Sequence, residues 1–196
     1  MIFLLFLLFV VFQIMAGAQE SPTYPMNVSL ISVYSLTISD KLAEGVWFTN
    51  ETGYKVNIQY PLLSGSSDNN ATWNYNATDD KTEYWIYVSG SVLVDICNGA
   101  KDNLCSNPDC AGVDNEEIVI GNVTWNSTTT NDASYPSILS SIPMVKGYDN
   151  TNKIFNIGSD TYVYLRYWLD IPPAYPAYNY STIYKIQAVL AGETCV

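Results

Sequence analysis

The sequence predicts an all-β protein, an immunoglobulin-like or pilin-like β-sandwich of about eight to ten strands. Along several segments apolar residues recur with a period of two, the pattern of a strand with one buried face and one wet face. Outside the first apolar run, no segment has a convincing helical period of 3.6 residues. The 16 tyrosines agree with this prediction, because aromatic residues are enriched in strands.

The N-terminal residues predict a secretory signal peptide. An apolar run from Ile2 to Phe12 is followed by Ala16-Gly17-Ala18, a small-x-small site of the kind that signal peptidase cuts. We therefore expect residues 1–18 to be removed and the protein to be secreted. The alternative is a retained membrane anchor, for which this run is at the lower limit of length. No later apolar stretch approaches that length, so no membrane contact is expected after cleavage.

The first strand is expected between residues 27 and 39, where five of six even-numbered positions are apolar against two of six odd-numbered ones. The even-numbered positions are Val28, Leu30, Ser32, Tyr34, Leu36 and Ile38. We interpret residues 19–40 as an N-terminal extension that carries this strand, and residues 41–196 as the sandwich domain. A strand with strict alternation follows at residues 54–60 and ends before Pro61.

The remaining segments continue the β pattern. Further strands are expected at residues 45–49, 117–125, 153–157, 161–169 and 182–190, with a weaker one at 138–147. The run 83–97 is interrupted by Ser89-Gly90-Ser91, so it is either a bent strand or a hairpin. Loops are expected at the polar stretches 62–82, 98–116 and 126–136. No internal repeat of fixed period and no dividing linker occur, so one domain is expected.

The four cysteines predict two disulfides, because an even number in a secreted chain is typical of a disulfide framework. They are Cys97, Cys105, Cys110 and Cys195. Three pairings are possible and the sequence does not choose among them, but each ties Cys195 back into the 97–110 region. The spacing lacks the paired short intervals of a four-cysteine zinc site, so no metal is expected here.

Seven Asn-x-Ser/Thr motifs predict a glycosylated surface in the same extracellular compartment. The acceptor residues are Asn27, Asn50, Asn70, Asn76, Asn122, Asn126 and Asn179. Sugar at many of these positions would leave only uncovered faces for protein contacts.

Composition excludes several classes of function. The formal net charge of −11 would repel phosphate backbones, so no nucleic-acid partner is expected. The chain contains no histidine, which removes Ser-His-Asp hydrolases, zinc hydrolases and blue-copper sites. We therefore expect no catalytic residues and no cofactor. Two alternatives stay open: calcium in the acidic segment 101–117, and a glycosidase using Asp95, Asp160 or Asp170.

Tyrosine is densest at residues 161–180. Tyr162, Tyr164, Arg166 and Trp168 share one face of the expected strand, and the arginine predicts that this face is at least partly solvated. Exposed aromatic rows can bind sugar rings. This supports an alternative function, a monomeric secreted carbohydrate-binding or cell-wall-associated module that binds surface glycans. Lys55 and Lys185, within expected strands, are further candidates for an intramolecular cross-link.

The two ends of the chain differ in a way that suggests assembly. Cys195 locks the C-terminal strand, whereas no cysteine holds the strand at residues 27–39. Such a strand can complete its own sheet or a neighbour's, supplying backbone hydrogen bonds and alternate side chains. Repeated head to tail, this exchange does not close and yields a filament of identical copies.

In its size, signal, acceptor motifs, free N-terminal strand and composition rich in Asn, Tyr, Ser and Thr, the chain resembles the archaeal thread pilins. The resemblance implies a glycosylated β-sandwich subunit on the surface of a thermoacidophilic archaeon, joined to its neighbours by donor-strand complementation and serving adhesion or biofilm formation. It places the donor strand within residues 27–39. The side chains filling the neighbour would be Val28, Leu30, Tyr34, Leu36 and Ile38, with Ser32 a weak contributor.

Overall fold

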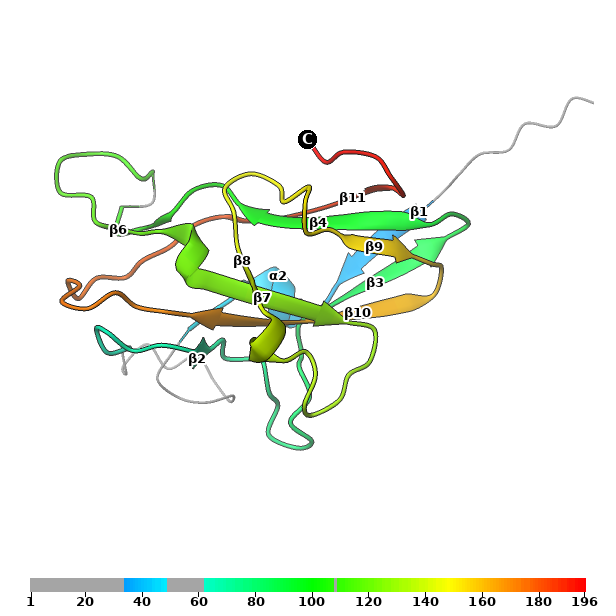
Figure 1. Ribbon diagram of the computed structural model, residues 1–196, viewed down its shortest axis with the longest axis horizontal. Coiled ribbons are helices and arrows are strands. Elements are labelled where there is room, and N and C mark those ends of the chain that lie inside the picture. The colour runs from blue at the N-terminus through cyan, green and yellow to red at the C-terminus, as the bar shows by residue number, and fades with distance from the viewer. Residues whose placement is uncertain (1–33, 49–61, 108) are drawn as a thin grey trace, which may run out of the picture. The chain divides into compact units, whose positions relative to one another are not determined.

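The computed structural model describes residues 34–48, 62–107 and 109–196, and within them the fold is all-β and sandwich-like, as the sequence predicts (Figure 1). These residues belong to one compact unit that spans residues 32–196. The predicted signal peptide at 1–18 and the expected strand at 54–60 lie outside the described residues.

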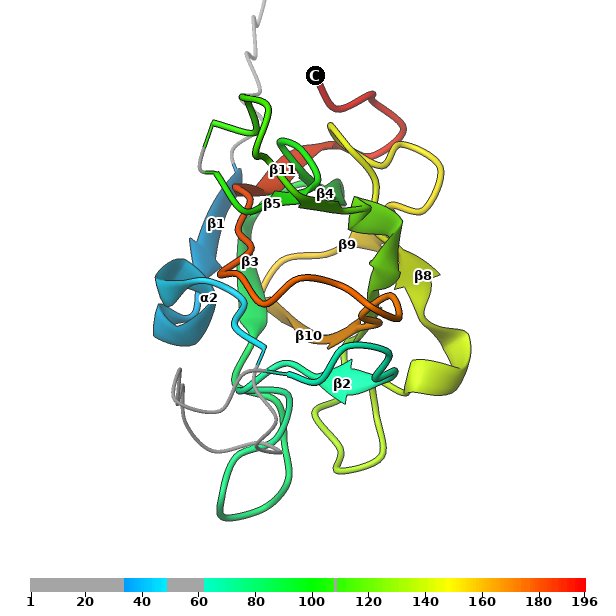
Figure 2. The ribbon, with the colours of Figure 1, turned by 90° about the vertical axis from the view of Figure 1, so that its left-hand side faces the viewer.

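Antiparallel strands form two main sheets. The larger sheet has the order β1 (Tyr34–Ile38), β3 (Trp85–Gly90), β10 (Thr161–Leu169), β7 (Val123–Thr128) and β8 (Ile142–Pro143), and β2 (Asn69–Asn70) also pairs with β10. The smaller sheet has the order β11 (Tyr184–Leu190), β4 (Val94–Ala100) and β9 (Ile154–Ile157). A separate ribbon joins β5 (Leu104–Cys105) to β6 (Glu117–Ile118). Figure 2 shows β11 and β4 in the upper layer and β10 in the lower one.

Alternation along the strands builds the core between the two layers. In β10 every second side chain, from Val163 to Leu169, is at most 5% exposed, and Ile86 and Val88 of β3 are fully buried. Each such side chain stabilises the fold by about 1.5–3 kcal/mol relative to an exposed position. The period of two in the sequence is therefore the direct cause of the layered arrangement.

One polar chain crosses this core. The hydroxyls of Tyr167 and Tyr184 lie 2.6 Å apart, and Tyr184 also donates to Oδ1 of Asn98 at 2.8 Å. These contacts link β10 to β11 and β4, and burial raises the pKa of both tyrosines. Because each hydroxyl has a partner, the core accommodates the two rings without leaving their polar ends unpaired.

The run 83–97 is a bent segment and not a hairpin. Its two strands, β3 and β4, do not pair with each other, because β3 lies in the larger sheet and β4 in the smaller one. The chain passes between the layers at residues 91–93, which begin with the last residue of the Ser89-Gly90-Ser91 interruption. This crossing places β4 at the centre of the smaller sheet.

Strand β4 is covered on both faces, and all seven of its residues are buried. Its outward side packs against the loop before β9 and the C-terminal residues. A Cβ atom at Gly99 would lie 1.8 Å from the carbonyl oxygen of Gly147, so only glycine fits there.

The structure corrects the expected strand at 45–49. Among its described residues, 45–48, only Phe48 makes a bridge, to Ala71, and residues 40–44 form a short helix, α2 (Asp40–Glu44). Ser39 caps this helix by accepting a hydrogen bond from the Leu42 amide, an N-cap that a five-residue helix needs. One and a half turns are too short to show a helical period in the sequence.

Two other expected strands are shorter than predicted. The segment 117–125 divides into β6, a 3₁₀ turn η1 (Ile120–Asn122) and the start of β7. The weak segment 138–147 contains a second turn, η2 (Ile138–Ser140), and the two-residue β8. Strands β9, β10 and β11 match the expected positions within two residues at each end.

Candidate functional site

Strand β1 is an edge of the larger sheet and contains three of the six predicted donor residues (Figure 2). It pairs antiparallel with β3 of the same chain, from Tyr34 opposite Gly90 to Ile38 opposite Ile86. Tyr34 and Leu36 pack against the core, whereas Ile38 is 40% exposed. The other three donor candidates, Val28, Leu30 and Ser32, lie outside the described residues.

Non-covalent contacts hold β1 in place. The Tyr34 hydroxyl donates to the carbonyl of Ala188 in β11 at 3.0 Å and so links β1 to the smaller sheet. On the outer face the hydroxyls of Ser35 and Ser89 lie 2.8 Å apart. Both disulfides join other parts of the chain. The described part of β1 is thus attached by one ladder and a few side chains.

Ser39 fixes the point where β1 ends. Its side chain is 3% exposed, and Oγ accepts hydrogen bonds from the amides of Leu42 and Trp85, each at 3.2 Å. Its own amide donates to the Trp85 carbonyl. These contacts therefore tie the C-terminal end of β1 to β3 in addition to the ladder.

Four aromatic rings cluster on the outer face of β3 and β10. Tyr162 contacts three of them: Trp85 edge-on at 5.2 Å between centroids, Tyr87 at 4.7 Å and Tyr164 in a parallel arrangement at 6.0 Å. Tyr162 is 43% exposed and the others are partly buried. Of the aromatic residues expected on this face, Tyr162 and Tyr164 gather here together with two rings from β3, whereas Trp168 is 3% exposed and lies outside the cluster.

The same face of β10 is closed further along, so the expectation of a solvated arginine is wrong. Arg166 is fully buried beneath loops 74–82 and 131–137. Its guanidinium donates to four backbone carbonyls at 2.8–3.2 Å, those of Asp80, Asp132, Ala133 and Pro136. The ring of Tyr75 lies 4.1 Å from Cζ. We call this group the loop clamp.

A second group holds the C-terminus and is called the C-terminal clamp. The disulfide Cys97–Cys195 joins the tail to β4, and the Asn150 side chain makes two hydrogen bonds to the backbone of Cys195. Beside it, Lys153 and Asp95 form an ion pair at 3.1 Å whose side chains are 8% and 1% exposed. The predicted tie from Cys195 to the 97–110 region is confirmed.

Two backbone amides also contact the buried carboxylate of Asp95, those of Asn156 and Gly192, each at 2.9 Å. Burial by itself would raise the pKa of Asp95, but these hydrogen bonds and the Lys153 ammonium outweigh it and lower the pKa. Lys153 also donates to the carbonyl of Glu193. Asp95 therefore has a structural role in which it stays ionised.

The other two carboxylates proposed for a glycosidase are likewise engaged. Asp160 accepts a hydrogen bond from the Tyr87 hydroxyl at 2.7 Å, and Asp170 accepts one from the amide of Asp68 at 2.7 Å. Of the two cross-link candidates, Lys55 lies outside the described residues, and the ammonium of Lys185 lies 5.1 Å from the centre of the Tyr148 ring.

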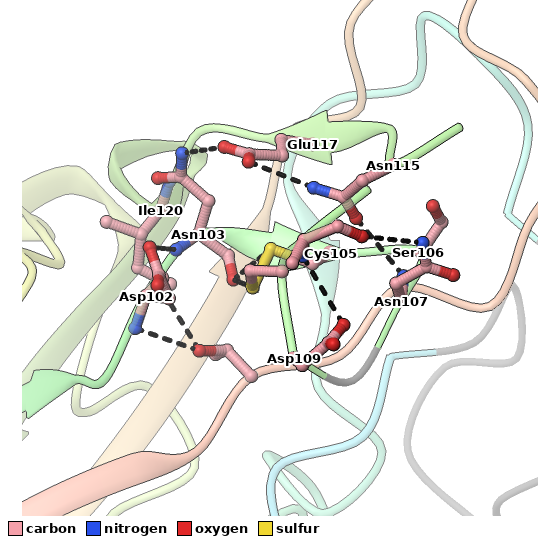
Figure 3. The surroundings of a disulfide bond; sticks show 12 residues. Asp102, Asn103, Cys105, Ser106, Asn107, Asp109, Asn115, Glu117 and Ile120 are labelled. Atoms are coloured by element: carbon pink, nitrogen blue, oxygen red, sulfur yellow. Dashed lines mark hydrogen bonds between the residues drawn. A yellow bond between two sulfur atoms is a disulfide. The ribbon is translucent and has the colours of Figure 1, made fainter. Parts of the chain in front are cut away.

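The disulfide Cys105–Cys110 closes a small loop in the acidic segment 101–117 (Figure 3). The Glu117 carboxylate accepts hydrogen bonds from the side-chain amides of Asn103 and Asn115. Asp102 forms an ion pair with Lys146 at 2.7 Å. Protein donors thus occupy these oxygens, and the described residues contain no group of three acidic, histidine or cysteine side chains arranged to hold a metal.

Acceptor asparagines differ in their surroundings. Asn179 is exposed, Asn70, Asn76, Asn122 and Asn126 are partly buried, and Asn27 and Asn50 lie outside the described residues.

Within the part of the chain that the structure describes, no helix is long and apolar enough to cross a membrane.

Comparison of the chain with family models, with curated proteins and with solved structures finds no match.

Proposed function

We propose that the protein is a structural subunit of an extracellular filament, in which β1 of one copy completes the larger sheet of the next copy. The observation that carries the proposal is the contrast at the two ends of the described chain. Edge strand β1 is held only by non-covalent contacts, whereas the C-terminus is fixed to β4 by a disulfide. An edge strand that can leave is the element that strand exchange requires.

Exchange would conserve the interactions of β1. If the strand leaves, the edge of β3 loses its backbone partners and the core loses the Tyr34 and Leu36 side chains. The same strand from a second copy restores the ladder and both side chains in the same register. Since nothing is lost in the end state, the cost is mainly that of bringing two copies together. Head-to-tail repetition of this step gives an open filament.

The proposal includes the role suggested by the resemblance to archaeal thread pilins, adhesion or biofilm formation at an acidic surface. The loop clamp supports an acidic setting, because among the described residues its arginine donates to backbone carbonyls and forms no ion pair with a carboxylate. Carbonyl acceptors keep their hydrogen-bonding capacity at any pH, whereas carboxylates lose theirs when protonated.

A cysteine pair tests the exchange directly. Ser35 and Ser89 are register partners across β1 and β3, and their hydroxyls are 2.8 Å apart. We expect a mixture of Ser35→Cys copies and Ser89→Cys copies to form disulfide-linked dimers under oxidation. Linkage requires β1 of one copy to lie in the sheet of another, and non-reducing electrophoresis detects it.

The double variant Ser35→Cys/Ser89→Cys supplies the matched control. Oxidised as a monomer it locks β1 into its own sheet, and we expect filaments to disappear in electron micrographs and to return after reduction. Filaments built from the locked subunit would contradict the proposal, as would a mixture that yields no dimers.

Carbohydrate binding is the second candidate, favoured by the four-ring cluster on β3 and β10. Tyr162 is its most exposed ring and contacts the other three. If the cluster binds sugar, Tyr162→Ala abolishes retention on a glycan array, whereas Tyr135→Ala, at a 57% exposed residue of the loop 131–137, leaves it unchanged. Equal retention of both variants would contradict this candidate.

A further inference from the structure

We infer that Asn179 carries a glycan in the folded protein and that Asn126 does not, although both occur in the same acceptor motif. The inference rests on the extracellular location in the proposed function, since the activated sugar is supplied there. It separates two asparagines that the sequence alone treats as equal.

Asn179 is free to react. It lies in the loop between β10 and β11, its side chain is exposed, and no hydrogen bond ties its amide to the other described residues. Ser181, which completes the motif, is also exposed, and its backbone pairs with that of Cys105. The acceptor and the motif hydroxyl are therefore both accessible on a segment with fixed backbone.

Aromatic rings flank this position. Tyr178 is 59% exposed, and its ring centroid lies 6.2 Å from that of Tyr180 at a steep angle. The Tyr180 hydroxyl donates to the carbonyl of Pro176, which fixes the orientation of the ring. An apolar face beside the acceptor can pack against the first sugar and shield the tyrosines from water.

The side chain of Asn126, in contrast, is engaged in hydrogen bonds. Its side-chain nitrogen donates one hydrogen to the carbonyl of Ser137 at 2.9 Å and the other to Oγ of Ser140 at 2.8 Å. Its Oδ1 accepts from the amide of Ser127. All hydrogen-bonding capacity of the nitrogen is used to hold the η2 turn against β7.

The chemistry of transfer determines which of these contacts a glycosylated, folded chain would have to give up. A new bond forms between Nδ2 and C1 of a sugar, the bond from C1 to a lipid-linked phosphate breaks, and the amide gives up one proton to a base of the transferase. The product nitrogen has one hydrogen left. Asn126 would therefore lose one of its two donor contacts and would have to admit a sugar between β7 and η2.

That displacement would reach the loop clamp. The segment that Asn126 holds begins at Ser137, and the preceding residue, Pro136, gives its carbonyl to Arg166. Asn122 is intermediate, because only one of its hydrogens is engaged, by the Asp170 carbonyl at 3.1 Å. The ranking follows the number of donor contacts that modification would break.

The test uses the full chain secreted from a eukaryotic host whose transferase acts on Asn-x-Ser/Thr. Glycopeptide mass spectrometry should find sugar on the Asn179 peptide and none on the Asn126 peptide. Asn179→Gln and Ser181→Ala should each remove one glycan mass from the intact protein. Thr128→Ala, which destroys the motif of Asn126 but keeps its amide, should leave the glycan mass unchanged.

Sugar on Asn126, or an unmodified Asn179, would overturn the inference. Asn126→Gln adds a second readout, since it should lower the melting temperature without changing the glycan mass. The Ser35/Ser89 cross-linking experiment does not depend on sugar, so a failed assignment here and a failed filament proposal give different results.

Discussion

The loop clamp and the C-terminal clamp both hold loops against the outer face of a sheet, the first at β10 and the second at β4. They do so through different interactions. In the loop clamp a buried arginine contacts four neutral carbonyls and an aromatic ring. In the C-terminal clamp a disulfide is combined with a buried carboxylate–ammonium pair.

The two clamps differ in the solution conditions that weaken them. A disulfide is sensitive to reductant and a carboxylate is sensitive to acid, whereas an arginine facing carbonyls is sensitive to neither. Among the four ion pairs of the described residues, the one between Asp95 and Lys153 is buried and the other three are largely exposed. Acid therefore acts on the C-terminal clamp more than on the loop clamp.

Removing the disulfide of the C-terminal clamp should have the largest effect. Cys97 and Cys195 are 98 residues apart, and closing a loop of this length stabilises the folded state by about 4.7 kcal/mol. We expect Cys97→Ala/Cys195→Ala to lower the free energy of unfolding by about that amount, measured by urea denaturation.

The second disulfide is the matched control for that measurement. Cys105 and Cys110 are only 5 residues apart, so Cys105→Ala/Cys110→Ala should cost about 2 kcal/mol, roughly half as much. Equal losses would show that loop length does not set the stability of this end of the molecule.

Removing the arginine of the loop clamp should have a slightly smaller effect. Arg166→Met fills similar volume but leaves four carbonyls without their donor, and we expect a loss of about 3 kcal/mol in urea denaturation. Arg166→Lys, which keeps the charge but lacks the planar fork, should recover part of it. Full stability of the methionine variant would show that water replaces the guanidinium and that the loop clamp is dispensable.

The sequence predicts the strands of the two sheets better than it predicts either clamp. The expected strand at 161–169 coincides with β10, because the run TYVYLRYWL is rich in the aromatic and β-branched residues that favour strands. Alternation also placed Arg166 correctly beside Tyr164 on one face. It could not show that two distant loops fold over the arginine, since their approach is a tertiary event with no local signal.

Similar limits apply to the cysteines and the short elements. Four cysteines indicate two bridges, but the choice of Cys97 for Cys195 follows from the crossing of the chain into the smaller sheet. Helix α2 depends on Ser39, whose hydroxyl is positioned by Trp85, 46 residues away in sequence. Two-residue strands such as β2 exist only through their partners, so no period of their own could reveal them.

The smallest expected effect is a dependence of the free energy of unfolding on pH. It also distinguishes the two clamps from each other. The folded-state pKa of Asp95 is lowered, so this carboxylate adds stability at pH values above its unfolded pKa of about 3.9. That contribution is lost as the pH falls through the folded pKa. Asp95→Asn should therefore be less stable than the wild type near neutrality and approach it in strong acid.

Arg166→Met supplies the contrast, because neither a guanidinium nor a carbonyl titrates in this range. Its stability deficit should change less between pH 7 and about pH 2 than the deficit of Asp95→Asn, which shrinks below about pH 4. Urea denaturation of the three proteins across this range measures both trends. A deficit of Arg166→Met that shrinks in parallel would mean that nearby carboxylates such as Asp80 and Asp132, and not the carbonyls, balance the buried arginine.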